Sequence, residues 1–320
     1  MKHLATVFVI LFACSVFAAS ATFAADNLVN MTDIKTHQIS KKLDKLELKA
    51  DKFGNKFDKK FQKYLDKRRL SIVKLSGKLN HFGYDMDTGG YIDYHATVPD
   101  ASVWIAEYPF TRFLNITSDD TGWWTMYVIK YKDRDLEFSF VYEKDGWITT
   151  KSNVITVTDE DNTDIAIQYI DPDYFNFAMV PMVESMVEAM TGMEFTFVNA
   201  MVVTVGKSWA SMHSDSLPHG DPGATVSSTP LLTFPTIGPL YFNEQVQPDP
   251  AWGYTSVDGG VAWVNVPVAT YDVTAHKEDV NYKTARFNIT EQDVACGVQL
   301  YIASPPDSLE GDNDSAAGVW

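Results

Sequence analysis

Cysteine is nearly absent from this chain, which has two among its 320 residues, Cys14 and Cys296. Cys14 lies in an N-terminal segment that we expect to be removed, so the mature chain would keep one cysteine and could form no intramolecular disulfide. Stability must then come from buried apolar surface. Apolar residues make up 45% of the chain and aromatic residues 13%, which is enough material for two cores.

Long uncharged apolar runs are also rare, and the longest lies at the N-terminus. Lys2 is followed by an uncharged stretch from Leu4 to Phe17 and then by small residues that end at Ala24. This pattern is typical of a secretory signal peptide over residues 1–24, and the run is shorter than the roughly 20 residues that a membrane-spanning helix needs. We expect a secreted or periplasmic protein with no transmembrane segment in its mature part.

Motifs of common enzymes are missing. The sequence has no P-loop, no dinucleotide-binding glycine pattern, no Cys-x-x-Cys, no His-Glu-x-x-His and no Gly-x-Ser-x-Gly elbow. We therefore expect a protein that is not an enzyme.

Positive charge is scarce and unevenly placed. The formal net charge is −16, yet residues 33–79 hold 15 basic and 6 acidic residues, whereas residues 80–320 hold 10 basic and 35 acidic ones. The chain is thus a basic arm joined to an acidic body. Because an acidic body repels phosphate backbones, nucleic acid is not an expected partner.

Apolar residues in the basic arm, which we place at residues 25–82, recur at steps of three and four. This spacing predicts one long amphipathic helix over residues 33–79, with Gly54 as its weak point. The apolar stripe could pack on the acidic body, on a second copy in a homo-oligomer through residues 33–79, on an anionic membrane surface or on a dedicated protein partner. The stripe consists of Ile39, Leu43, Leu46, Ala50, Phe53, Phe57, Phe61 and Tyr64.

After Gly83 the apolar pattern changes to period two, in short β-forming runs separated by acidic turns that contain glycine. Residues 123–129, 136–142 and 154–157 are among these runs. This pattern predicts a mainly β fold with two tandem antiparallel Greek-key β-sandwiches, over residues 83–170 and 193–304. Methionine and valine at helical spacing predict a short connecting helix over residues 171–192, with Gly192 as its cap. Residues 305–320 form a polar, acidic tail.

The second β region contains a set of short turn and strand motifs: Pro222-Gly223-Ala224-Thr225-Val226, Thr255, Asp258-Gly259-Gly260, Val266-Pro267, Thr270-Tyr271 and Val273-Thr274-Ala275. Through these motifs it resembles the carboxypeptidase regulatory-like family, a seven-stranded, transthyretin-like (prealbumin-like) β-sandwich. The first β region is similar to the same outline through Pro99-Asp100-Ala101-Ser102-Val103, Thr117, the Asp119-Asp120-Thr121-Gly122 turn and Asp145-Gly146-Trp147. The resemblance implies non-catalytic modules that pack against, display or bind something else.

One loop gathers reactive side chains and supports an alternative function. Two His-x-Asp units, His213 with Asp215 and His219 with Asp221, could bind a divalent metal through imidazole and carboxylate groups. A weak secreted hydrolase that uses Ser208 or Ser211 is a further alternative, although residues so close in sequence rarely converge into a catalytic triad.

Two other patterns could bind ligands. Asp85, Asp87 and Asp93 follow the predicted arm helix with the spacing of a calcium loop, but Ala96 stands where that loop needs a bidentate glutamate. Tryptophans could bind carbohydrate where they are exposed. We therefore expect an exported structural or binding protein with a carbohydrate, cell-envelope or protein partner. The candidate aromatic residues are Trp104, Trp123, Trp124, Trp147 and Trp252.

Overall fold

The computed structural model describes residues 63, 65–85, 90–158, 162–165, 167–171, 173–208, 211, 220–296 and 299–303. The expected signal peptide, most of the basic arm and the acidic tail lie outside the described residues. The chain divides into two compact units, residues 1–73 with 128–135 and residues 74–127 with 136–320. Within the smaller unit, Lys132 pairs with Asp66 at 3.0 Å and Arg69 pairs with Asp133 at 3.5 Å.

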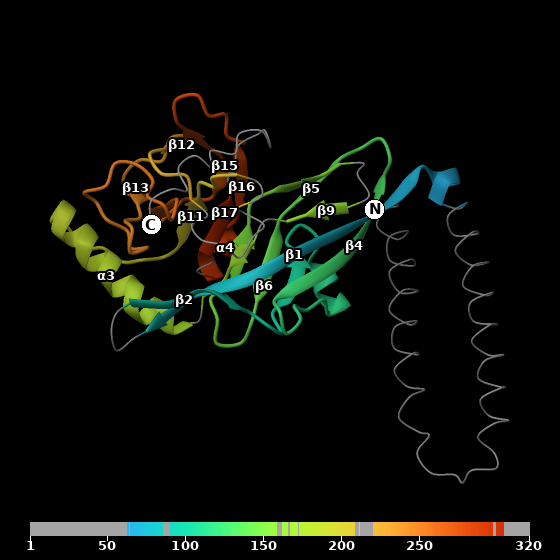
Figure 1. Ribbon diagram of the computed structural model, residues 1–320, viewed down its shortest axis with the longest axis horizontal. Coiled ribbons are helices and arrows are strands. Elements are labelled where there is room, and N and C mark those ends of the chain that lie inside the picture. Colours follow the sequence, from blue (N-terminus) through green and yellow to red (C-terminus); the bar gives the residue numbers. More distant parts are fainter. Residues whose placement is uncertain are drawn as a thin grey trace, which may run out of the picture. The chain divides into compact units, whose positions relative to one another are not determined.

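The larger unit contains most of the strands, in line with the predicted mainly β fold (Figure 1). Its first half contains β1 (Leu70–Asp85, which begins in the smaller unit), β2 (Gly90–Thr97), β3 (Ser102–Ile105), the 3-10 helix η1 (Pro109–Leu114), β4 (Trp123–Tyr131), β5 (Leu136–Phe138), β6 (Phe140–Glu143), β7 (Thr150–Ser152), β8 (Ile155–Val157), β9 (Asn162–Asp164) and β10 (Gln168–Tyr169).

Its second half begins with the helix α3 (Asp173–Thr191), which lies in the segment where we expected a connecting helix. The elements that follow are β11 (Ala200–Thr204), β12 (Thr225–Thr229), β13 (Ile237–Tyr241), β14 (Gly260–Val264), β15 (Ala269–His276), β16 (Ala285–Ile289), α4 (Glu291–Cys296) and β17 (Gln299–Ala303).

The predicted arm helix does not reach Leu79, because β1 begins at Leu70. From Val73 to Gly77, burial alternates: Val73 and Leu75 are buried, whereas Lys74 and Ser76 are partly exposed. Such alternation is the period of a strand. Residues 70–82, which we assigned to the arm, therefore belong to a sheet.

Aromatic side chains form the core of the first half. Trp124 on β4 packs against β6. The centre of its ring lies 4.7 Å from that of Phe140 and 6.2 Å from that of Tyr142, both on β6. Gly77 on β1 makes room for this indole, since a Cβ atom there would lie 2.7 Å from the Trp124 ring. Strands β1 and β4 therefore pack face to face with β3 and β6.

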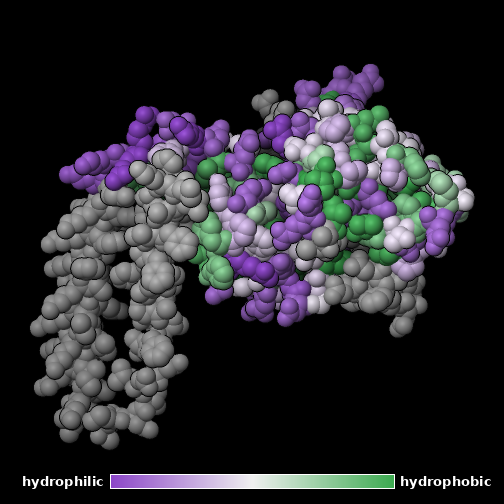
Figure 2. Space-filling view, turned by 180° about the vertical axis from the view of Figure 1, so that it is seen from behind, coloured by the Kyte–Doolittle hydropathy of each residue, from purple (hydrophilic) through white to green (hydrophobic). Residues whose placement is uncertain are grey.

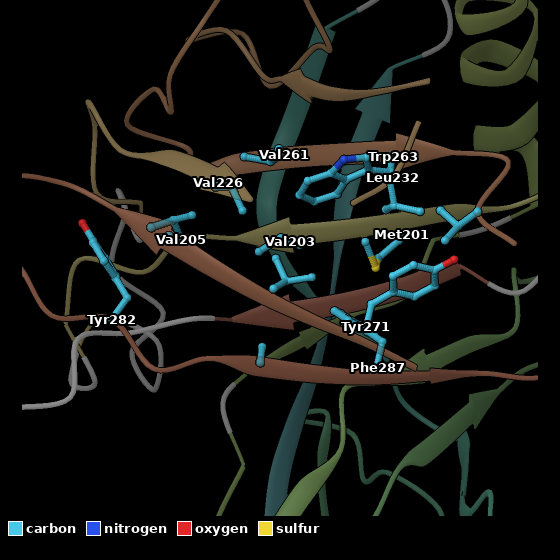
Figure 3. Packing of buried hydrophobic residues seen from close by; sticks show 14 of the residues in the cluster. Met201, Val203, Val205, Val226, Leu232, Val261, Trp263, Tyr271, Tyr282 and Phe287 are labelled. Carbon is cyan, nitrogen blue, oxygen red and sulfur yellow. The ribbon is translucent and has the colours of Figure 1, made fainter. Parts of the chain in front are cut away.

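The second half is a β-sandwich with an apolar interior. Strands β12, β15 and β16 form one sheet, and β13, β14, β11 and β17 belong to the other. Figure 3 shows side chains from β11 and β14 pointing toward those of β15 and β16. The shared core includes Met201, Val203, Val205, Val226, Val261, Trp263, Tyr271, Val273, Phe287 and Ile289.

The residues of the family resemblance have structural roles in this sandwich. Thr255 is fully buried, and its Oγ1 donates to the carbonyl of Asp221 at 2.6 Å and accepts from the Ala224 N–H at 2.9 Å. The hydroxyl of Tyr271 donates to the carbonyl of Pro267 at 3.1 Å. Val266 and Tyr271 both belong to the core.

One sheet of the sandwich in the second half continues into the first half of the chain. The order of its seven strands is β13-β14-β11-β17-β7-β6-β3, so β17 of the second half lies beside β7 of the first. This pairing is parallel, with Leu300 opposite Lys151, and β1 also pairs in parallel with β9 and β10. The expectation of purely antiparallel sheets is therefore wrong, because long connections bring distant strands side by side.

A buried lysine reinforces the boundary between β7 and β17, which we call the seam. Lys151 on β7 has 3% of its side chain exposed, and its Nζ lies 2.7 Å from Asp293 Oδ2 and 2.7 Å from the Asn288 carbonyl. The N–H of Val154 also donates to the carbonyl of Arg286 at 2.7 Å. These contacts tie the first half of the chain to β16 and α4.

We predict that Lys151→Ala destabilises the fold by about 2–4 kcal/mol, since removing one partner of a buried ion pair leaves the other partner uncompensated. Lys132→Ala is the control. It removes an exposed ion pair and should cost less than about 1 kcal/mol. Urea unfolding followed by tryptophan fluorescence measures both losses, and equally small losses would show that Lys151 does not support the seam.

Candidate functional site

A groove of about 590 Å³ lies beside the seam, between the outer face of β3, β6 and β7 and the start of α4. Register places Trp104 on β3 directly opposite Val141 on β6, and Val141 directly opposite Lys151 on β7. Alternation along each strand puts these three side chains on the face away from the aromatic core, since their neighbours Val103, Phe140 and Tyr142 face inward. They form the floor of the groove.

One wall of the groove comes from the second half of the chain. Asn288 at the end of β16 and Thr290 to Asp293 at the start of α4 line this wall. Thr290 and Asp293 form a capping box, because the Thr290 N–H and Oγ1 donate to Asp293 Oδ2 at 2.7 and 2.8 Å. The cap and the ion pair to Lys151 use the same carboxylate, so the wall is fixed to the floor.

Charged groups accompany the Trp104 indole on the strand side of the groove, where Glu107 and Glu143 belong to the lining and Arg112 lies outside it. Arg112 of η1 pairs with Glu143 at 2.8 Å and lies 5.9 Å from the centre of the Trp104 ring. Glu107 Oε2 accepts a hydrogen bond from the Ser139 N–H at 2.8 Å. Trp104 is partly exposed, and its buried Nε1 makes no hydrogen bond to any described residue. The groove thus offers an aromatic face surrounded by carboxylate, amide and hydroxyl groups.

The tryptophans named as carbohydrate candidates have different environments. Trp124 is 2% exposed and belongs to the core, so it is excluded. Trp123 is exposed on β4, Trp147 contacts the ring of His81 at 5.1 Å, and Trp252 contacts Tyr254 at 5.7 Å. Trp104 lines the groove, which makes it the strongest of the five candidates.

Of the four residues proposed to bind a metal, one lies within the described residues. His213, Asp215 and His219 lie outside the described residues, whereas Asp221 is buried and contacts the Lys277 ammonium and the Tyr282 hydroxyl. Desolvation, together with the Asp221 carboxylate, raises the pKa of Tyr282. The structure thus gives Asp221 a structural role inside the second sandwich.

In the part of the chain that the structure describes, no group of three or more His, Cys, Asp or Glu side chains is arranged to hold a metal. None of the helices described there is long and apolar enough to cross a membrane.

The calcium-loop pattern follows a strand and not the helix that we expected. Asp85 ends β1, where it pairs with Gly90, and Asp93 lies within β2 opposite Gly83. Asp87 lies outside the described residues. The described residues on both sides of Asp87 belong to two antiparallel strands, which differs from the helix and loop of that calcium motif.

The two serines proposed as nucleophiles cap each other's backbone. The Ser208 N–H donates to Ser211 Oγ and the Ser211 N–H donates to Ser208 Oγ, both at 3.1 Å. Sequence reasoning missed a Ser–His pair elsewhere, Ser227 Oγ and His276 Nε2 at 2.7 Å, whose members lie on β12 and β15. It also missed Lys151 and Asp293, although the Thr-x-x-Asp spacing before α4 was a visible capping signal.

Comparisons with known proteins identify no family, since no family model and no curated protein match this chain. Among solved structures, the Bacillus anthracis TIE protein aligns with 74% of this chain and 34% of its own, at 11% identity and a TM-score of 0.21. This chain therefore spans about a third of that protein.

Two further structures match nearly their whole length. The shaft pilin SpaA of Lactobacillus rhamnosus GG aligns with 75% of this chain and 98% of its own, at 10% identity and a TM-score of 0.18. A family CBM26 module of Eubacterium rectale Amy13K, solved with maltoheptaose, aligns with 73% and 93%, at 11% identity and a TM-score of 0.19. With TM-scores this low, none of these likenesses carries an argument about this chain.

One carboxyl group in the second sandwich has an unusual environment. Asp258 lies in the turn before β14, where its Oδ2 accepts the Gly260 N–H at 3.0 Å. Loss of solvent raises the pKa of Asp258 to about 7, and this hydrogen bond offsets the effect only in part. Between about pH 4 and pH 7 the native state therefore retains a proton that the unfolded chain, with an ordinary aspartate pKa of about 4, releases.

We predict that stability falls by about 1–3 kcal/mol as the pH rises from 4 to 7, and levels off above 7, because the native carboxyl must ionise where it is poorly solvated. Asp258→Asn should remove most of this decline while keeping an oxygen for the Gly260 N–H. Urea unfolding at several pH values measures the effect, with exposed Asp145→Asn as the control. An unchanged pH profile in Asp258→Asn would contradict the assignment.

Proposed function

We propose that this chain is an exported, non-catalytic binding protein whose seam groove binds carbohydrate. The observation that carries the proposal is the partly exposed Trp104 on the floor of a groove that is otherwise lined largely by polar groups. A sugar ring has an apolar C–H face and a rim of hydroxyl groups. An aromatic surface with a few fixed polar groups suits both parts.

The rigidity of the groove supports this function. Its floor is three hydrogen-bonded strands, and its wall is fixed through the contacts of Asp293 with Lys151 and Thr290. A site built on strands and an anchored helix needs little ordering when a ligand binds, so less binding free energy is lost.

Two of the four carboxylates in the groove lining are engaged within the protein. Glu143 is held by Arg112 at 2.8 Å, and Asp293 by Lys151 at 2.7 Å. These two side chains are therefore committed to holding the groove together rather than placed to exchange protons with a ligand. The resemblance of residues 255–289 to the carboxypeptidase regulatory-like family and the N-terminal signal pattern support an exported module of this kind.

Figure 2 shows hydrophobic residues at several places on an otherwise largely hydrophilic face. Several aromatic and aliphatic side chains are well exposed, among them Phe113 at 85% and Leu231 at 73%. Such residues are compatible with a protein partner as a second kind of ligand, in keeping with a structural or display role.

We predict that Trp104→Ala weakens oligosaccharide binding by about tenfold or more, whereas Trp104→Phe keeps part of the affinity because a smaller aromatic face remains. The assay is isothermal titration calorimetry with glucose and N-acetylglucosamine hexamers. Trp123→Ala is the matched control, since it removes an exposed indole from β4 and should leave affinity unchanged. A loss in Trp123→Ala with none in Trp104→Ala would refute the groove as the binding site.

A further inference from the structure

The cations of the groove are already neutralised by the protein. Lys151 is 3% exposed and lies against Asp293 and the Asn288 carbonyl, so its ammonium is not presented to a ligand. Arg112 is more exposed but pairs with Glu143 and lies over the Trp104 ring. An anionic ligand would therefore have to displace an existing partner from either group.

Two carboxylates of the groove have no cationic partner among the described residues. Glu107, just beyond β3, accepts a backbone N–H from Ser139 through Oε2. Glu291, in the first turn of α4, is exposed. They belong to different parts of the lining, Glu107 to the strand side and Glu291 to the α4 wall. After internal pairing, the groove keeps a net negative charge next to an aromatic ring.

This combination favours a cationic group on the ligand. A protonated amine near Trp104 would gain from the electron-rich ring face and from the two carboxylates. The body around the groove adds attraction over a longer range, because residues 80–320 hold 35 acidic and 10 basic residues.

We propose that the groove selects saccharides with free amino groups, such as glucosamine polymers, over neutral and acidic saccharides. The inference rests on the proposed function, since it names the chemical class of sugar for the same groove. Trp104 contacts the C–H face of the ring, and Glu107 and Glu291 receive the ammonium groups.

The experiment compares three hexamers by calorimetry with the full mature chain: glucosamine, N-acetylglucosamine and a uronic acid. The first two share one backbone, so acetylation of the amine is their sole difference. We expect the glucosamine hexamer to bind at least tenfold more tightly than its acetylated counterpart, and the uronic acid hexamer to bind most weakly.

Variants separate the groove from general attraction to an acidic surface. Glu107→Gln combined with Glu291→Gln should reduce the preference for the glucosamine hexamer over its acetylated counterpart to less than threefold. The control Glu244→Gln, an exposed glutamate outside the groove lining, should retain the full preference. A preference that survives the double variant would overturn the inference, because it would then arise from overall charge.

The other outcomes distinguish a failure of the amine selectivity from a failure of the proposed function. Equal or tighter binding of the acetylated hexamer overturns the amine selectivity but leaves the proposed function intact. Absence of binding to all three hexamers, and to glucose hexamers, overturns both proposals. A synthetic peptide of residues 33–62 that displaces glucosamine and binds more tightly would identify the basic arm as the ligand and overturn the inference.

Discussion

The seam depends on one buried ammonium group. Lys151 sits on β7 opposite the start of β17, and its contacts with Asp293 and Asn288 join strands from the two halves of the chain. A buried lysine is tolerable only when hydrogen-bonded acceptors offset its desolvation. The same three residues line the groove, so the interaction that stabilises the seam also builds the candidate binding site.

This arrangement explains the electrostatic character of the groove. Because Lys151 and Arg112 are used internally, their charges position side chains rather than attract anions. Glu107 and Glu291, which have no cationic partner in the part of the chain that the structure describes, then leave the groove lining with a negative charge. Since the surrounding body is also acidic, local and long-range fields act in the same direction.

Local sequence patterns predicted much of the β structure. The runs at 123–129, 136–142 and 154–157 coincide with β4, with β5 and β6, and with β8. These runs match strands because period-two alternation directly reflects which side chains face a core. Leu70 to Leu79 was assigned wrongly to a helix, since its lysines continue the composition of the arm while its burial follows a strand.

Long-range pairing could not be predicted in the same way. Nothing in local periodicity indicates that β17 pairs with β7, or that Lys151 meets Asp293 across 142 residues of sequence. Trp104 was one of five tryptophans named from composition, and only its register opposite Val141 showed that it lines a groove. The site is thus a product of tertiary pairing, whereas the strands that carry it are local.

The most direct test of the central claim is a titration of the ¹⁵N-labelled protein with glucosamine hexamer, observed through the indole N–H signals of its eight tryptophans. The account predicts that the Trp104 signal shifts and saturates, since its ring lies on the groove floor, while those of Trp123 and Trp252 stay in place. Shifts confined to Trp123 or Trp252, or a Trp104 signal that does not move while the ligand binds, would contradict it.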